Sequence, residues 1–385
     1  MRSIAFVVLS GLLLLVLTGC WDKAELTEFG YVQAVAIDRN ASGKFELTTL
    51  FYVPSAGSET QKPTRKGITI KTQGDTIFDA LRDISSQFGR KAKWDHMRII
   101  LLGEQLLRKQ SAGEVLDFFS RDHEPRATVL MLVAEGQAGE YLTVKPFIEY
   151  TIGQQLRKME KIAAKYSANT SRVPLFDLAI QLKSETGIAT VPFAQLEKAA
   201  KTVTLAGVAV LKEGKVGFIL TPAETQSLLM LTNQYEEGIL EFPCPGKPDS
   251  PTDKESFEVF SLDTSVNPVI QHNEAAVDVR IKIKGSVGEL RCSALMSREE
   301  GEQFEERIAK QVERDLQKTI ARLQKEKTDA LGIGNRIFRT NPALWKRWKP
   351  AWPDHFAAIR FHVAVEVRVL NTGMNIGTPF GKKGG

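Results

Sequence analysis

One continuous apolar stripe over residues 297–325 predicts a long amphipathic helix, and this helix constrains the fold more than any other segment. Its apolar side chains recur at helical spacing at six positions: Phe304, Ile308, Val312, Leu316, Ile320 and Leu323. Ser297 and Glu300 have the spacing of a capping box, which marks the first turn of a helix. Such a stripe faces a core and leaves the rest of the helix in solvent. At about 1.5 Å per residue, a helix of about 30 residues extends for about 45 Å.

Two segments with alternating polarity flank this helix and predict strands. Apolar residues alternate with charged or polar ones at these positions: Val277, Val279, Ile281 and Ile283 before the helix, and Phe361, Val363, Val365, Val367 and Val369 after it. A strand with one apolar face and one wet face is typical of an antiparallel sheet. We therefore expect an α+β fold with several domains, mixed or antiparallel sheets, helices packed on one face, and the long helix in the C-terminal domain.

The first 200 residues alternate between predicted strands and helices. Residues 31–37 and 45–51 flank a polar turn and predict an antiparallel hairpin. Residues 128–134 are apolar almost throughout, which predicts a strand buried on both faces. Helical spacing of apolar residues predicts helices over 75–88, 104–109, 112–119, 154–165 and 175–184.

Length and composition allow two or three ordinary globular domains. Removing residues 1–19 leaves 385 − 19 = 366 residues, and a domain usually spans ~100–200 residues. We expect an N-terminal domain over 20–200, a C-terminal domain over 201–375 and a flexible tail over 376–385. The net charge of +5 arises from 51 basic and 46 acidic residues, and this excess is too mild to indicate nucleic-acid binding.

The N-terminus predicts a lipoprotein signal peptide over residues 1–19. Arg2 precedes an apolar run over residues 4–17, and Leu17-Thr18-Gly19-Cys20 resembles the bacterial lipobox, whose cysteine receives diacylglycerol before cleavage. An uncleaved anchor helix, or an ordinary signal that ends by chance in cysteine, is the alternative. The apolar run is short for a bilayer that needs ~20 residues. We therefore expect a mature chain that begins at Cys20 and is held outside a bacterial membrane by two acyl chains.

Two cysteines, Cys244 and Cys292, remain after Cys20 is assigned to lipidation. An extracytoplasmic location permits a disulfide between them. Two cysteines are too few to indicate a disulfide-rich scaffold, however, and sequence alone does not give the distance between them. A disulfide and a pair of buried free thiols both stay open.

The sequence predicts no catalytic, cofactor-binding or metal-binding residues. A helical zinc motif needs a second histidine four residues after the first, but the residue four positions after His123 is Ala127. G-x-S-x-G elbows and phosphate-binding loops are absent, and Gly332-Ile333-Gly334 lacks the next glycine of a dinucleotide fingerprint. Two polar clusters are expected to form salt bridges and caps or a surface for a partner: Asp95, His96, Arg121, Asp122, His123, Glu124 and Arg126.

Three tryptophans near the C-terminus allow two interpretations. Trp345, Trp348 and Trp352 alternate with basic residues, as at a lipid headgroup boundary. Pro350 and Pro353 interrupt any long helix there, so we favour packing of the rings into the C-terminal core.

Several blocks together resemble the Ger(x)C family of spore germination lipoproteins. The matching blocks are residues 17–26, 35–38, 74–90, 94–96, 102–104, 115–126, 205–211, 329–334 and 342–345 and the strand that ends at Gly373. Gly332-Ile333-Gly334 stands where the family often has Gly-Phe-Gly, which is a conservative departure. The resemblance extends from residue 17 to about residue 375, and the combination is far more specific than any one block.

The resemblance implies a non-enzymatic C subunit of a nutrient germinant receptor, acylated at Cys20 at the outer face of the spore inner membrane. It implies two membrane partners, an A-type subunit with a large soluble domain and a B-type transporter-like subunit, and no cofactor. It also implies a mixed α/β chain of up to three small domains, with the N-terminal domain split near residue 140.

The alternative is an extracytoplasmic solute-binding lipoprotein that delivers a ligand to a transporter. That fold needs two doubly wound lobes with parallel, apolar strands. The half-polar strands at 277–284 and 361–369 argue against it, so the receptor subunit is the leading hypothesis.

Overall fold

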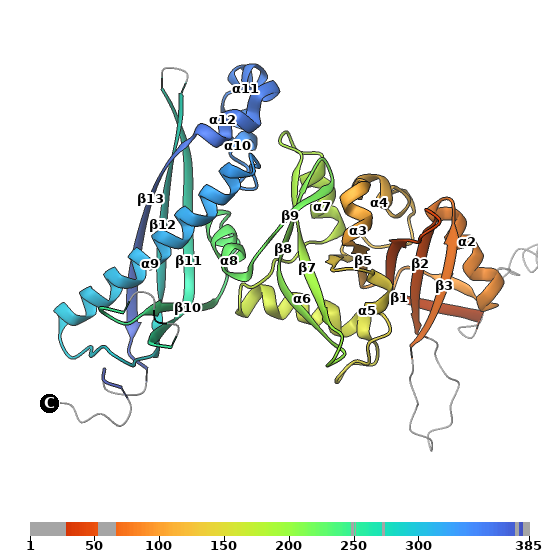
Figure 1. The fold of residues 1–385 in the computed structure, drawn as a ribbon, viewed down its shortest axis with the longest axis horizontal. Helices are drawn as coiled ribbons and strands as arrows, with labels where there is room; N and C mark the ends of the chain where they lie inside the picture. The colour runs from red at the N-terminus through yellow and green to blue at the C-terminus, as the bar shows by residue number, and fades with distance from the viewer. Residues whose placement is uncertain are drawn as a thin grey trace, which may run out of the picture.

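The chain folds into two domains, each built on its own β-sheet. The computed structural model describes residues 28–52, 67–247, 250, 252–271, 274–373 and 377–379. Within these residues the fold is mixed α/β, with one sheet of nine strands and one of four. Figure 1 shows the two sheets in different halves of an elongated molecule. The predicted signal peptide, Cys20 and most of the predicted tail lie outside the described residues.

The N-terminal sheet has parallel strands in its centre and antiparallel strands on both sides. Its strands are β1 (Phe29–Arg39), β2 (Phe45–Tyr52), β3 (Ile68–Gly74), β4 (Lys91–Lys93), β5 (Ile99–Gly103), β6 (Leu130–Ala134), β7 (Ile188–Glu197), β8 (Thr202–Lys212) and β9 (Lys215–Leu220). They lie in the order β3-β2-β1-β5-β6-β7-β8-β9, and β4 pairs with β1. Strands β1, β5, β6 and β7 run parallel, whereas β1–β2, β2–β3, β7–β8 and β8–β9 are antiparallel. The hairpin predicted at residues 31–51 is therefore confirmed.

Helices cover both faces of this sheet. They are α2 (Ile77–Phe88), α3 (Glu104–Lys109), α4 (Ala112–Arg121), α5 (Ala138–Tyr141), α6 (Ile152–Tyr166) and α7 (Leu175–Leu182). Residues of α2, α3, α4 and α7 form one core with the sheet, and residues of α5 and α6 form another. Every residue of β5 and β6 is buried as a result, which explains their unbroken apolar sequence. The predicted domain boundary near residue 200 stays a prediction; β8 and β9, which follow it, pair within this sheet.

The C-terminal domain packs its helices against a four-stranded sheet. The strands, in the order β10-β11-β12-β13, are β10 (Gly238–Pro243), β11 (Lys254–Gln271), β12 (Glu274–Glu289) and β13 (Arg360–Asn371). The helices are α8 (Pro222–Leu231), α9 (Arg298–Lys325), α10 (Ile333–Thr340), α11 (Pro342–Trp348) and α12 (Trp352–Ala358). Helix α9 has 28 residues and begins with the predicted capping box of Ser297 and Glu300. All six side chains of its predicted stripe are buried in the core.

Strands β12 and β13 pair in parallel, which differs from the antiparallel sheet favoured by their polarity. Val277 lies opposite Phe361 and Ile283 opposite Val367. Helices α9 to α12 intervene between the two strands and return the chain to the edge where β12 begins, so β13 runs in the same direction. Alternating polarity indicates that one face of each strand is exposed to solvent. It does not indicate whether the neighbouring strand runs parallel or antiparallel.

The three C-terminal tryptophans pack into the core, as predicted. Trp345, Trp348 and Trp352 are each at most 5% exposed. The buried carboxylate of Asp329 accepts hydrogen bonds from the backbone N–H groups of Ile333 (3.0 Å) and Gly334 (2.7 Å) and from Nε1 of Trp352 (3.1 Å). Asp329 therefore caps α10 and fixes one indole ring at the same time, although its burial raises its pKa.

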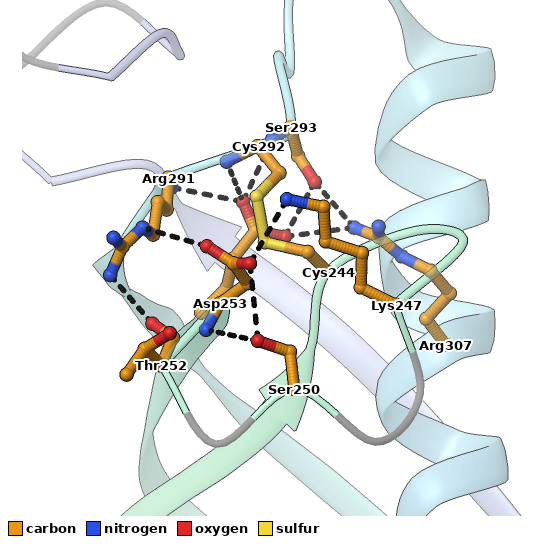
Figure 2. Close-up of a disulfide and its surroundings, with 10 residues drawn as sticks. Cys244, Lys247, Ser250, Thr252, Asp253, Arg291, Cys292, Ser293 and Arg307 are labelled. Carbon is orange, nitrogen blue, oxygen red and sulfur yellow. Dashed lines mark hydrogen bonds and ion pairs between the residues drawn. A yellow bond between two sulfur atoms is a disulfide. The ribbon is translucent and has the colours of Figure 1, made fainter.

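A disulfide joins the end of β10 to the segment after β12. The Cα atoms of Cys244 and Cys292 are 5.8 Å apart. Figure 2 shows the bridge between a loop, where Asp253 pairs with Lys247 at 2.9 Å, and the segment that leads to α9. The bridge closes a loop with a sequence separation of 48 residues, and such a cross-link restricts the unfolded chain.

The Glu255 carboxylate organises the segment that carries Cys292. Its Oε1 accepts backbone N–H groups from Arg291, Cys292 and Ser293 at 2.8 to 3.0 Å. Its Oε2 accepts the Ser293 hydroxyl at 2.5 Å and lies 3.2 Å from Nη2 of Arg307 on α9. Burial alone raises the pKa of Glu255, but these donors outweigh burial and hold the pKa below its ordinary value.

We expect Ile308→Ala to destabilise the protein by about 2–5 kcal/mol, because Ile308 is fully buried between α9 and the sheet. Gln317→Ala, at an exposed position of the same helix, should change stability by less than about 0.5 kcal/mol. Urea unfolding followed by circular dichroism gives both values. Equal effects of the two substitutions would contradict the packing of α9.

We expect Glu255→Gln to reduce the loss of stability in acid. The folded-state pKa of Glu255 is lower than the unfolded-state pKa, so the carboxylate stabilises the fold above the unfolded pKa. That contribution disappears as the pH falls through the folded pKa. Urea unfolding from neutral pH into the acid range should show a shallower decline for Glu255→Gln than for the wild type. The exposed Glu258→Gln on the same strand is the control and should retain the wild-type slope.

Candidate interaction surface

The first predicted polar cluster follows β4. Trp94 is buried, whereas the Asp95 and His96 side chains are 46% and 48% exposed and lie 3.8 Å apart. The His96 ring meets the ring of Tyr31 edge-on at a centroid distance of 5.2 Å. Both side chains are therefore accessible, and the contact with Tyr31 of β1 orients His96.

The second predicted cluster follows α4. Arg121 pairs with Asp117 one turn earlier at 2.7 Å, and its guanidinium lowers the pKa of that carboxyl group. Asp122 accepts the backbone N–H of Glu124 at 3.0 Å. The His123 side chain is 96% exposed and lies 3.6 Å from Asp122. This segment is a tight turn that presents His123 to solvent.

The structure brings the two clusters together through Glu124. Its Oε2 accepts the backbone N–H of Trp94 at 3.3 Å, which joins the turn after α4 to the segment after β4. Arg126 follows in the same turn and is exposed. The predicted residues thus share one surface, and their role in partner contact stays a prediction.

Sheet direction explains why these segments meet. Strands β1, β5 and β6 are parallel, so all three begin at one edge of the sheet, which we call the starting edge. The segments that lead into β5 and β6 carry Arg98 and Arg126, and β4 pairs with the first residues of β1. Sequence reasoning did not bring Arg98 to this surface, because that requires knowing which strands are parallel neighbours.

Arg98 is the centre of a group of three arginines at the starting edge. Its backbone N–H donates to Gln33 at 2.9 Å, and its Nε donates to the Gln33 side chain at 3.3 Å. Burial lowers the pKa of Arg98, and the charges of Arg157 and Arg126 lower it further. Arg157 lies on α6, which approaches β1 so closely that a Cβ on Gly153 would lie 3.1 Å from the Gln33 carbonyl oxygen.

An exposed apolar loop before α6 was not predicted from the sequence. Phe147, Ile148 and Tyr150 are 72%, 92% and 56% exposed. Hollows of about 750 and 650 Å³ are lined by the segment that leads into this loop, and both include Thr143 to Pro146. The available signal was a run of large apolar residues with neither helical nor strand spacing.

The two domains contact each other through the turn between α7 and β7. The Glu185 carboxylate accepts hydrogen bonds from Nε1 of Trp345 (2.7 Å) and from Nζ of Lys349 (2.8 Å), which together lower its pKa. Next to it, the Thr186 backbone N–H donates to the Asn335 side chain at 3.2 Å. Trp345 and Lys349 of the tryptophan segment therefore contribute to the domain interface.

Two properties of the described residues bear on the kind of site present. Within the described ranges, no group of three or more His, Cys, Asp or Glu side chains is arranged to hold a metal ion. In that same part of the chain, no helix is both long and apolar enough to cross a membrane.

Comparisons with known proteins cover nearly all of the chain. The family model "Spore germination protein N-terminal domain" matches residues 22–196, and "Spore germination B3/GerAC like, C-terminal" matches residues 206–373. Spore germination protein B3 of Bacillus subtilis is 26% identical over 371 residues, which cover 94% of this chain and 96% of that protein. Spore germination protein KC of the same organism is 23% identical and covers 97% of each chain.

A solved structure has the same fold. The crystal structure of the GerBC protein superimposes with a TM-score of 0.60 at 22% identity and covers 88% of this chain and 97% of that one. The family matches, the relatives and the fold agree along both domains. The chain therefore belongs to the Ger(x)C family of spore germination proteins.

Proposed function

We propose that this chain is the lipid-anchored, non-catalytic C subunit of a spore germinant receptor and acts by assembling with A-type and B-type membrane subunits. The main support is that spore-germination family models match residues 22–196 and 206–373. The match therefore extends through both domains instead of resting on one motif. The sequence Leu17-Thr18-Gly19-Cys20 adds the lipidation signal.

The energetics of acyl chains support anchoring through Cys20. One chain gives only marginal membrane binding, whereas the two chains of a diacylglycerol hold a protein stably, at about 0.8 kcal/mol per buried methylene. The subunit would then lie at the outer face of the spore inner membrane, where the other two subunits are embedded.

We expect Cys20→Ala to release the protein from the spore membrane and to weaken the response to nutrients. The variant lacks the thiol that receives diacylglycerol, so it has no acyl chains to partition into the bilayer. Fractionation of spores and the release of dipicolinate measure the two effects. Ser10→Ala leaves the cysteine intact and should behave as the wild type. A Cys20→Ala protein that stays in the membrane fraction and supports normal germination would refute the proposal.

We also propose that the surface around His96 and His123 contacts the other subunits. Both side chains are exposed, so replacing them should leave the fold intact. We expect His96→Ala/His123→Ala to recover several-fold less A-type and B-type subunit when tagged protein is purified from detergent-solubilised spore membranes. His362→Ala, at an exposed position on β13, is the control. Unchanged recovery by the double variant would exclude this surface.

A further inference from the structure

Five cations at or beside the starting edge have no acidic partner within the described part of the chain. They are Lys91, Lys93, Arg98, Arg126 and Arg157, and we call them the basic edge. Lys93 lies over the ring of Phe29 at 5.3 Å, and Arg98 donates to Gln33; neither contact neutralises a charge. The basic edge therefore carries a local positive potential.

Two of the acidic side chains nearby accept hydrogen bonds from local backbone groups. The Asp122 carboxylate accepts a backbone N–H, and the Glu124 carboxylate accepts that of Trp94. Asp95 lies beside His96, and Glu28 is exposed immediately before β1. These carboxylates shape the turns of the edge and form no ion pair with its five cations.

Large apolar side chains are exposed at two places on the N-terminal domain, one of them next to Arg126. Phe176 is 60% exposed, and its backbone N–H donates to the carbonyl of Ala127, the residue after Arg126. The apolar loop with Ile148 ends at Thr151, which is close to Gly67 at the beginning of β3: a Cβ on Gly67 would lie 3.6 Å from Cγ2 of Thr151. Exposed aromatic and aliphatic residues beside lysine and arginine are typical of proteins that lie on a membrane interface.

The lipid tether would emerge at the same edge, and this step rests on the proposed function. The described chain begins at Glu28, directly before β1, and Cys20 precedes it by 28 − 20 = 8 residues. Eight residues span at most about 29 Å. Acylation at Cys20 would therefore hold the start of β1, where Lys91 and Lys93 of β4 pair with it, within that distance of the bilayer surface.

We propose that the basic edge and the apolar loop at Phe147–Tyr150 form a docking surface for anionic phospholipid headgroups. The five cations attract the negatively charged surface, and the side chains of Phe147 and Ile148 enter the headgroup boundary. The diacylglycerol retains the protein, and this surface determines which face of the N-terminal domain meets the membrane.

The test uses the chain from residue 20 with Cys20→Ser, so that no acyl chain contributes. All described helices and strands follow Glu28, so this chain retains the described fold. Co-sedimentation is measured with vesicles of phosphatidylcholine alone and with vesicles that also contain phosphatidylglycerol, at low and at high salt. We expect binding to the anionic vesicles only, and weaker binding at high salt because salt screens surface charges.

Two variants separate the charged and apolar contributions. Lys91→Glu/Arg126→Glu/Arg157→Glu should weaken binding by about tenfold or more, since each basic residue near an anionic surface is worth roughly fivefold. Ile148→Asp should weaken binding several-fold at both salt concentrations. The matched control Arg280→Glu/Lys282→Glu/Lys284→Glu reverses three exposed charges on β12 and should stay within about twofold of the parent. Circular dichroism verifies that each variant is folded.

Absence of binding to anionic vesicles at low salt would overturn the inference, as would an equal loss in the β12 control. Either result would point to a protein partner for this edge. Neither result bears on the receptor role, which the germination response of Cys20→Ala tests separately. Conversely, normal germination of Cys20→Ala would remove the receptor proposal and leave the vesicle measurement intact.

Discussion

The parallel alignment of β1, β5 and β6 is the constraint on which the N-terminal domain and its surface depend. Strands β5 and β6 are buried along their whole length, so helices must cover both faces of the sheet. Each parallel strand must also begin at the same edge, which forces the chain to return to that edge before every strand. The returning segments place Lys91 opposite Phe29 and Arg98 beside Gln33 of β1, and they carry Arg126 at the start of the neighbouring β6. The chemistry of the starting edge is therefore a consequence of topology.

Buried carboxylates fix the connections that the sheets leave irregular, and their environments determine their pKa values. Asp38 accepts the backbone N–H groups of Ala138 and Gly139, at 2.9 and 2.8 Å, and holds the beginning of α5. Burial raises the pKa of Asp38 despite these two donors. Glu255 has a lowered pKa instead, because three backbone donors and one hydroxyl act together and Arg307 lies beside them. The balance between burial and donated hydrogen bonds sets each pKa: burial outweighs the donors at Asp38 and at Asp329, which accepts three hydrogen bonds, whereas the donors outweigh burial at Glu255.

Local periodicity predicted the elements that have strong local signals. Helix α9, the first hairpin and the buried strand β6 each follow from the spacing of apolar residues in one segment. Strand β11 was missed because it contains many polar residues. Backbone pairing with β10 and β12 stabilises it, and the sequence of one segment does not reveal such pairing. The predicted residues around His96 and His123 share a surface, but the arginine group at Arg98 requires three segments from distant parts of the sequence. The sequence of a single segment indicates neither the parallel pairing of β12 with β13 nor the grouping of the three arginines.

An acyl tether and a docking surface solve different physical problems. In the proposed receptor subunit, two acyl chains would supply enough free energy to retain the protein, but a tether of eight residues would leave the folded domain free to rotate within about 29 Å of the bilayer. A receptor subunit that must meet two membrane-embedded partners gains from a fixed orientation, because fewer encounters then present the wrong face. Five unpaired cations contribute too little to replace the tether and enough to bias the orientation. On this view, the starting edge lies on the membrane and brings the His123 turn to the level at which a membrane-embedded partner can reach it.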